Sequence, residues 1–221
     1  MKHLVGMLIL VEVFKLGVLA QVTAHPTRQQ WTTIENYAAA QYFDYGASGS
    51  IILNGTCKAE SSGYNISIER ISPPSTDSFK KIDDALSALT LLNQHLSWTR
   101  KSNGLVQLKD DRVTAPVLSL ILRKVEIRSK VDPELAVEAL MRNPEVVSFL
   151  KKNGIRLGIA YTGNLSHQNW RRTPSISKEL ENVSVEEVLD QIVIMQHGMW
   201  IYDACSTESG EKITIGFAMV R

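Results

Sequence analysis

The stretch that decides the fold is SVEEVLDQIVIMQHGMWIYDACSTESGEKITIGF, residues 184–217. Ser184 and Glu187 have the spacing of a capping box, which predicts a helix that begins there. Ser209-Gly210 then separates two apolar, β-branched runs, 199–205 and 212–217, and this pattern predicts a β-hairpin. Apolar residues recur every three or four positions along the helix, as is typical of one buried helical face: Val185, Val188, Leu189, Ile192 and Met195.

A similar stretch occurs about a hundred residues earlier in the chain. Residues 84–89, DALSAL, match residues 187–192, EVLDQI, at an offset of 103. Asp77 is the predicted N-cap of this earlier helix, and a hairpin with Asn103-Gly104 in its turn is expected after it. The apolar positions expected to face the core are Phe79, Ile82, Leu86, Leu89 and Leu91 or Leu92.

A strand is expected before each helix, over 65–71 and over 175–181, so residues 65–108 and 175–217 are predicted to form two strand-helix-hairpin units. The alternative is chance convergence of two common supersecondary units. The predicted fold class is α+β, with small antiparallel or mixed sheets and a helical middle segment. The predicted organisation is a first unit over 25–130, a helical connector over 131–160 and a second unit over 161–221.

Shorter patterns predict the remaining elements. A helix is expected over 32–45, and a strand over 50–53 that ends in an Asn54-Gly55 turn. A helical stretch over 115–122 and a strand over 124–128 follow. Further helices should begin near Pro133 and Pro144, because proline suits the first helical turn, and a strand is expected over 156–161.

Composition excludes some classes of protein. The 221 residues are 44% hydrophobic and 21% charged, which is ordinary for a chain that buries a core. Lys and Arg number 24 against 23 Asp and Glu, so the net charge is +1. A charge this small gives no field that would collect nucleic acid, and no nucleic-acid partner is expected.

The N-terminus has the pattern of a signal peptide over residues 1–24. Lys2 precedes an apolar run, and small residues allow cleavage after Ala20 or Ala24. Glu12 and Lys15 interrupt the apolar stretch, and the alternative is an amphipathic N-terminal helix of a cytosolic protein. The uninterrupted apolar run is shorter than the roughly 20 residues of a spanning helix, so no stable membrane span is expected after cleavage.

Cys57 and Cys205 are the two cysteines of the chain. In an oxidising compartment two cysteines most simply form one disulfide, which is the pairing expected here. The alternative is two unpaired thiols, because a sequence does not show the distance between their α-carbons.

Residues 180–192, followed by Trp200-Ile201-Tyr202, resemble the short periplasmic domain at the N-termini of secretins and TonB-dependent receptors. The whole chain is also similar to a group of uncharacterised bacterial exported proteins, through residues 45–49, 55–57, 143–146 and 202–205. The resemblance implies a periplasmic or secreted location and a cell-envelope protein as partner. It carries over no catalytic residue and no cofactor, because the domain it points to is a non-enzymatic interaction module.

Few residues are candidates for a site. The five histidines lack zinc-like spacing, so no metal is expected, and His95 and His197 should cap the helices that precede them. Asp83-Asp84 and Glu186-Glu187 are interpreted as solvated first-turn acids that complement the helix dipole. The segment nominated for recognition, whose Trp and Arg are typical of binding hot spots, contains His167, Trp170, Arg171 and Arg172. Its alternative is a Trp folded back onto the core.

These observations favour an exported, non-enzymatic interaction module of the bacterial cell envelope that binds a protein partner. The alternative is an exported hydrolase whose site is assembled from scattered residues. No nucleophile elbow, phosphate loop or dinucleotide fingerprint occurs in the sequence, so no catalytic residue is nominated.

Overall fold

The structure is a computed structural model that describes residues 33–60, 63–71, 73–74, 79–128, 133–161, 177–208 and 210–219. Residues Thr32–Arg221 form one compact unit. Its elements are, in chain order, α2 (Ile34–Asp44), β1 (Gly49–Glu60), β2 (Gly63–Ile68), α3 (Ile82–Leu92), β3 (Leu96–Arg100), β4 (Val106–Asp110), β5 (Ile121–Arg128), α4 (Pro133–Met141), α5 (Pro144–Lys152), β6 (Arg156–Tyr161), β7 (Ser177–Ser184), α6 (Val185–Gln196), β8 (Gly198–Thr207) and β9 (Gly210–Met219).

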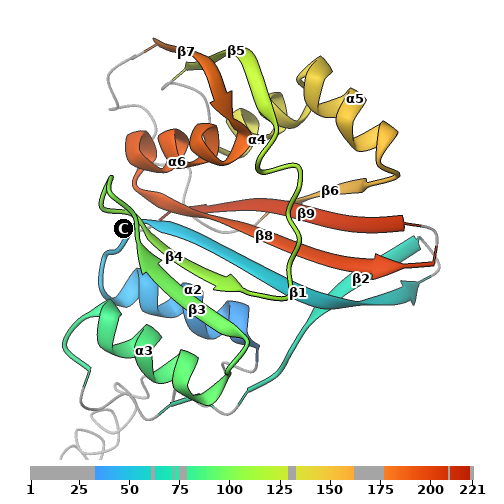
Figure 1. Cartoon of the computed structure of the whole chain (residues 1–221). Helices are drawn as coiled ribbons and strands as arrows, with labels where there is room; N and C mark the ends of the chain where they lie inside the picture. Colours follow the sequence, from blue (N-terminus) through green and yellow to red (C-terminus); the bar gives the residue numbers. More distant parts are fainter. Residues whose placement is uncertain are drawn as a thin grey trace, which may run out of the picture. The chain divides into compact units, whose positions relative to one another are not determined.

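The described strands form a seven-stranded mixed sheet and a separate two-stranded ribbon. The order in the large sheet is β3-β4-β1-β8-β9-β6, with β2 paired to β1, and β5 pairs with β7 in the ribbon (Figure 1). Strands from the first and the last third of the chain therefore share one sheet. They meet where Gly49–Asn54 of β1 run parallel to Met199–Ala204 of β8. The prediction of an α+β fold with mixed sheets is confirmed.

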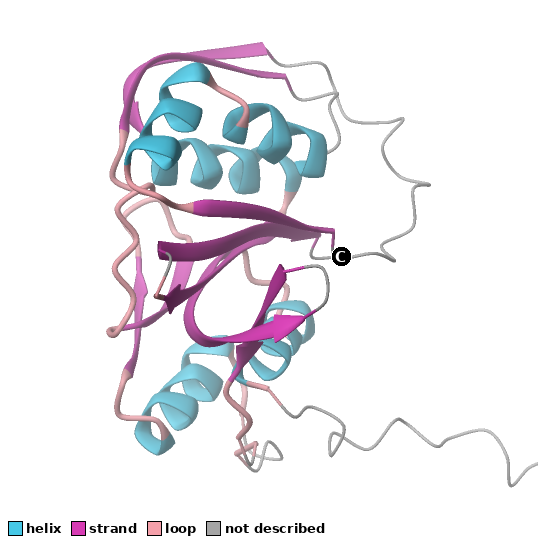
Figure 2. Cartoon of the chain, turned by 90° about the vertical axis from the view of Figure 1, so that its right-hand side faces the viewer, coloured by secondary structure: helices cyan, strands magenta, loops and turns pink. Residues whose placement is uncertain are grey.

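Helices cover both faces of the large sheet. The helices α4, α5 and α6 lie on one face and α2 and α3 on the other (Figures 1 and 2). In β8, Trp200 and Tyr202 belong to the core under α4–α6, whereas Met199 and Ile201 belong to the core over α2 and α3. Because β8 is buried on both faces, its apolar residues run without polar alternation, as expected for a central strand.

Both predicted helix-hairpin units are present. Helix α3 is followed by the antiparallel pair β3–β4, and α6 by the antiparallel pair β8–β9. One hydrogen bond recurs in both units: Trp98 Nε1 donates to Ser87 Oγ at 3.2 Å, and Trp200 Nε1 donates to Asp190 Oδ1 at 2.9 Å. Each tryptophan thus fastens the first hairpin strand to the middle of the preceding helix.

The two helices begin in different ways. The capping box of α6 is confirmed, because Ser184 Oγ accepts from Glu187 N at 3.2 Å and Glu187 Oε2 accepts from Ser184 N at 2.8 Å. Helix α3 begins at Ile82, with Lys81 as N-cap and no side-chain capping bond, so the start predicted after Asp77 is wrong. The expected burial of Leu91 or Leu92 is also wrong, since both are exposed.

Two local predictions fail because contacts from distant parts of the chain override a local signal. Asn54-Gly55 is not a turn, and β1 continues through it to Glu60. A Cβ on Gly55 would lie 2.5 Å from Ile66 Cγ2, so the glycine permits close packing of β1 on β2. Residues 115–122 form turns and the start of β5 instead of a helix. Leu118 O and Leu120 O accept from the first N–H groups of α6.

The predicted disulfide is confirmed: Cys57 on β1 is bonded to Cys205 on β8, with 5.3 Å between their α-carbons. The predicted signal peptide over 1–24 lies outside the described residues. Within the ranges that the structure describes, no helix is long and apolar enough to cross a membrane.

Candidate functional site

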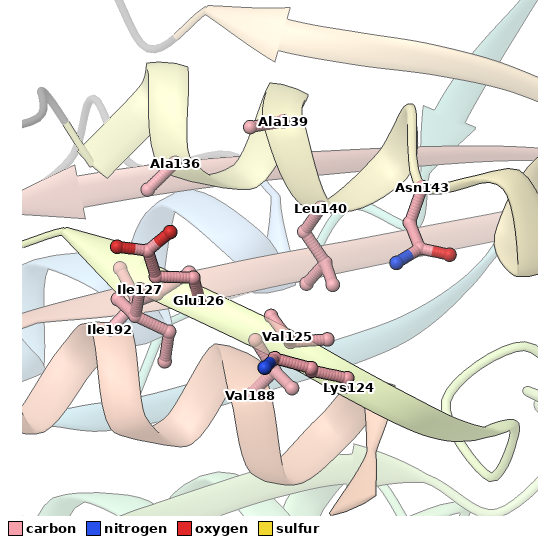
Figure 3. A pocket seen from close by; sticks show the side chains of 10 residues that line it. All are labelled: Lys124, Val125, Glu126, Ile127, Ala136, Ala139, Leu140, Asn143, Val188 and Ile192. Carbon is pink, nitrogen blue, oxygen red and sulfur yellow. The ribbon is translucent and has the colours of Figure 1, made fainter. Parts of the chain in front are cut away.

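A groove runs along the edge of β5 that faces away from β7. Its deeper part has a volume of about 360 Å³ and lies between β5, α4 and α6 (Figure 3). Four consecutive β5 residues, 124–127, line it. Because successive side chains of a strand point to opposite faces, a cavity that touches four in a row lies along the strand edge. The edge of a strand carries backbone groups that can pair with an added strand.

The sequence of α4 explains why this part is hollow. Ala136 and Ala139 line it with small side chains, whereas Leu140 reaches toward the floor (Figure 3). Val188 and Ile192, one turn apart on α6, form the floor and are buried. The lining is therefore mainly apolar, which suits apolar side chains of a ligand.

A second, shallower part of the groove continues along β5 toward α5. This cavity of about 510 Å³ is lined by residues of β5 and of the loop before it, together with the start and middle of α5, including Leu120, Ile121, Pro144 and Phe149. Arg123 and Glu145 line this second cavity. Glu145 accepts from the backbone N–H of Arg123 at 3.0 Å and from its guanidinium at 3.2 Å. This clamp holds β5 against α5, and we call the whole feature the β5 groove.

Charges of both signs lie on the ribbon beside the groove. Lys124 Nζ lies 2.5 Å from Glu179 Oε1 of β7, and the neighbouring carboxylate raises the pKa of Lys124. Glu126 lies on the same strand as Lys124 (Figure 3). The groove is therefore apolar inside with a mixed-charge rim, and it has no strong preference for an anion or a cation.

The structure describes only some of the residues nominated from the sequence. His167, Trp170, Arg171 and Arg172 lie outside the described residues, so their nomination stays a prediction. His197 is the C-cap of α6, in the left-handed conformation. His95 differs from its expected role, since its Nε2 lies 3.5 Å from Glu69 and 3.9 Å from Asp110, two carboxylates outside the helix.

The first-turn acids do more than complement helix dipoles, which corrects their interpretation as solvated charges. Asp83 accepts from Arg100 at 2.5 Å. Glu186 accepts from Lys101 Nζ at 2.7 Å and from Gln107 at 2.8 Å. Each acid thereby joins a helix to a hairpin.

Lys101 is the centre of a polar cluster between α6 and the β3–β4 turn. Its Nζ lies 2.7 Å from Asp190 Oδ2 as well as from Glu186 Oε1, and 5.8 Å from the centroid of the Trp200 ring. The other Asp190 oxygen accepts from Trp200. Because every charged group here has a partner of opposite charge, we interpret the cluster as a structural junction.

A second pair of acids lies between α2 and the sheet. Burial, together with the nearby Glu35, raises the pKa of Asp203 well above its usual range, although Thr214 donates a hydrogen bond that lowers it. Burial also raises the pKa of Glu35. Asp203 is 9% exposed. A protonated carboxyl can act as a general acid, but this one lies inside the packing of α2 against β8.

No group of three or more possible metal ligands occurs among the residues that the structure describes. Comparisons with protein-family models, curated proteins and solved structures find no match to the chain.

Sequence reasoning missed the groove because no single segment carries its signal. The middle segment was interpreted as a helical connector, yet α4 and α5 face a strand, β5, that pairs with β7 about fifty residues later. One sequence feature could have helped: Ala136 and Ala139 lie on an otherwise large-residue helix, and small residues on one helix face indicate close approach or open space.

Proposed function

We propose that this protein is a protein-interaction module that binds an extended segment of a protein partner in the β5 groove. The observation that carries the proposal is the groove itself, which follows the edge of β5 over residues 124–127 and has an apolar floor. Toward the start of β5, the backbone N–H of Arg123 is already bonded to Glu145. An extended peptide can pair its backbone with such an edge and place alternate side chains in the pockets.

Exposed apolar side chains on the elements that form the groove support a protein partner over a small polar ligand. Ile121, which lines the shallower part, is 56% exposed. Leu135 on α4 and Val147 on α5 are 52% and 48% exposed. Exposed apolar groups that gather around a groove are typical of interaction surfaces.

We propose further that the module works outside the cytoplasm, as part of the bacterial cell envelope. The Cys57–Cys205 disulfide supports an oxidising compartment. The helix-hairpin units agree in outline with the strand-helix-strand pattern of the short periplasmic domain of secretins and TonB-dependent receptors. Export would place the groove where envelope proteins expose extended segments.

Selection from a library of random linear peptides displayed on phage tests the proposal. Peptides selected on the wild-type chain are measured against Ala139→Trp, which fills the groove, and against Asn36→Trp, an exposed position on α2 across the sheet. We expect Ala139→Trp to weaken binding by about tenfold or more, or ~1.4 kcal/mol. Asn36→Trp should leave binding unchanged. Peptides that bind all three proteins equally, or no selected peptide at all, would refute the β5 groove as the site.

A further inference from the structure

The large sheet is built from two repeats with the same internal pairing. The first repeat contains α2, β1, α3, β3 and β4, and the second contains α5, β6, α6, β8 and β9. In each repeat the strand after the first helix runs parallel to the second hairpin strand: β1 to β4, and β6 to β9. The first helix of each repeat ends in the same way, with a glycine in the left-handed region, Gly46 at φ 60° and Gly154 at φ 64°.

The two repeats are joined through unlike edges. The outer strand β1 of the first repeat pairs with the hairpin strand β8 of the second, in parallel. The equivalent strands of the two repeats run in opposite directions, and their helices cover opposite faces. One operation, a half turn combined with a shift along the sheet, therefore relates the first repeat to the second. An interface of unlike edges does not close on itself and can be repeated.

The same two kinds of edge are left over at the ends of the sheet. In the described part of the chain, β6 pairs only with β9 and β3 only with β4. Strand β6 is the equivalent of β1, and β3 is the equivalent of β8. The outer edges of β6 and β3 are therefore equivalent to the two edges that pair in the β1–β8 junction.

The exposed side chains near β3 agree with a missing neighbour. Trp98 is only partly buried, whereas its equivalent Trp200 is fully buried. At the end of α3, Leu92 is 64% exposed, whereas its equivalent in α6, Met195, packs against the core. Side chains that are buried near the β1–β8 junction in the second repeat are therefore more exposed at the equivalent positions of the first repeat.

We propose that the outer edge of β6 pairs in parallel with the outer edge of β3 of a second copy of this chain. The existing junction gives the register. In the first repeat Trp98 is level with Ile51 through Leu108, and Ser50, one residue before Ile51, lies opposite Trp200. In the second repeat Trp200 is level with Tyr161 through Phe217, so the equivalent of Ser50 is Ala160. Trp98 of the second copy therefore lies opposite Ala160. Repetition of this contact produces open rows of chains, independent of the β5 groove.

A proline on β3 tests the pairing. The N–H of Lys101 donates to Leu105 O, across the β3–β4 hairpin. The N–H of Val106, the residue paired with Arg100, donates to Ser48 O and so points away from β3. Because N–H groups alternate along a strand, that of Arg100 faces the outer edge. Arg100→Pro removes this donor at an edge position that tolerates proline. Arg100→Thr is the matched control, since it also loses the side-chain bonds to Asp83 and Gly104 O but keeps the N–H.

Sedimentation velocity over a wide concentration range is the measurement. We expect the average mass of the wild-type chain and of Arg100→Thr to rise with concentration past that of a dimer without a plateau. Arg100→Pro should associate about tenfold more weakly or not at all, which corresponds to ~1.4 kcal/mol. The Arg100→Pro chain keeps its β6 edge and can still pair with β3 of a wild-type chain. An excess of the variant should therefore stop the growth of wild-type rows and lower their average mass. A wild-type chain that stays single, a plateau at the dimer, or unchanged association of Arg100→Pro overturns the proposal.

A disulfide test remains informative if the proline variant does not fold. The proposed register places Ile159 opposite Ser97 of the second copy, as Gly49 lies opposite Met199 in the existing junction. Paired residues of neighbouring strands lie within disulfide reach, with strands about 4.8 Å apart. Oxidation of Ser97→Cys/Ile159→Cys should yield a ladder of covalent multimers on a non-reducing gel. Ser97→Cys alone should yield none. Absence of the ladder at concentrations where the wild-type chain associates overturns the register.

Discussion

Two aspartates on neighbouring elements show how the partner of a buried charge decides its effect. Asp190 lies between Lys101 and Trp200 and has both oxygens bonded. Asp203 lies beside another acid, Glu35, and its Oδ1 has no hydrogen-bond partner among the described atoms. Removal of charge should therefore destabilise the protein at the first position and stabilise it at the second.

Asp203→Asn should raise the free energy of unfolding at pH 8 by about 1–3 kcal/mol, because a buried acid without a counter-charge is costly when ionised. The folded-state pKa of Asp203 lies above its ordinary value of 3.8. The stability that the protonated acid provides is present below that ordinary value and is lost as the pH rises through the folded-state pKa. Asn does not titrate, so the stabilisation should shrink toward zero at pH 4. Urea unfolding at both pH values measures it, and an equal effect at both would contradict the assignment.

Asp190→Asn should lower the free energy of unfolding at pH 7 by about 1–3 kcal/mol. The substitution leaves Lys101, which is 19% exposed, with one carboxylate in place of two. Urea unfolding, followed by the fluorescence of the buried Trp200, measures the loss. Lys101→Met in the Asp190→Asn background is the control, since removal of the leftover charge should recover part of the loss.

Helix periodicity was the strongest signal that the sequence offered at the scale of elements. Leu86 and Leu189 were expected in the core and are fully buried. The capping box of α6 was predictable because all its partners lie within four residues. The start of α3 and the strand through Asn54-Gly55 were not, because packing on α2, β2 and β8 decides them. The same holds for the β5 groove, whose two walls are brought together by the β5–β7 pairing.

Leu86→Ala and Leu189→Ala should each lower the free energy of unfolding by about 2–5 kcal/mol, through lost apolar burial and a residual cavity. The two positions are equivalent in the repeats, one under each face of the sheet. Val147→Ala, at a position that is 48% exposed, should change stability by only about 0.5 kcal/mol. Thermal unfolding followed by circular dichroism compares the three variants. A small loss at one leucine only would mean that the two cores are not equivalent.

At the scale of the whole molecule, the chain is held together by contacts between its two repeats. The β1–β8 pairing, the Lys101 cluster and the disulfide all cross from one repeat to the other. The sequence predicted two units and a disulfide between them. It did not show that the units share one sheet, because parallel pairing of strands about 150 residues apart leaves no local pattern.

The disulfide should therefore control the stability of the entire sheet. Cys57 and Cys205 are 148 residues apart in sequence, and closing a loop of this size reduces the entropy of the unfolded chain by an amount equivalent to roughly 4–5 kcal/mol. Cys57→Ser/Cys205→Ser should lose about 2–5 kcal/mol and unfold at lower denaturant concentration. Guanidinium unfolding with and without a reductant measures the loss. The reductant should shift the midpoint of the wild-type chain toward that of the double variant and leave the double variant unchanged. If both proteins instead have the same midpoint without reductant, the β1–β8 pairing and the Lys101 cluster hold the two repeats together without help from the covalent bond.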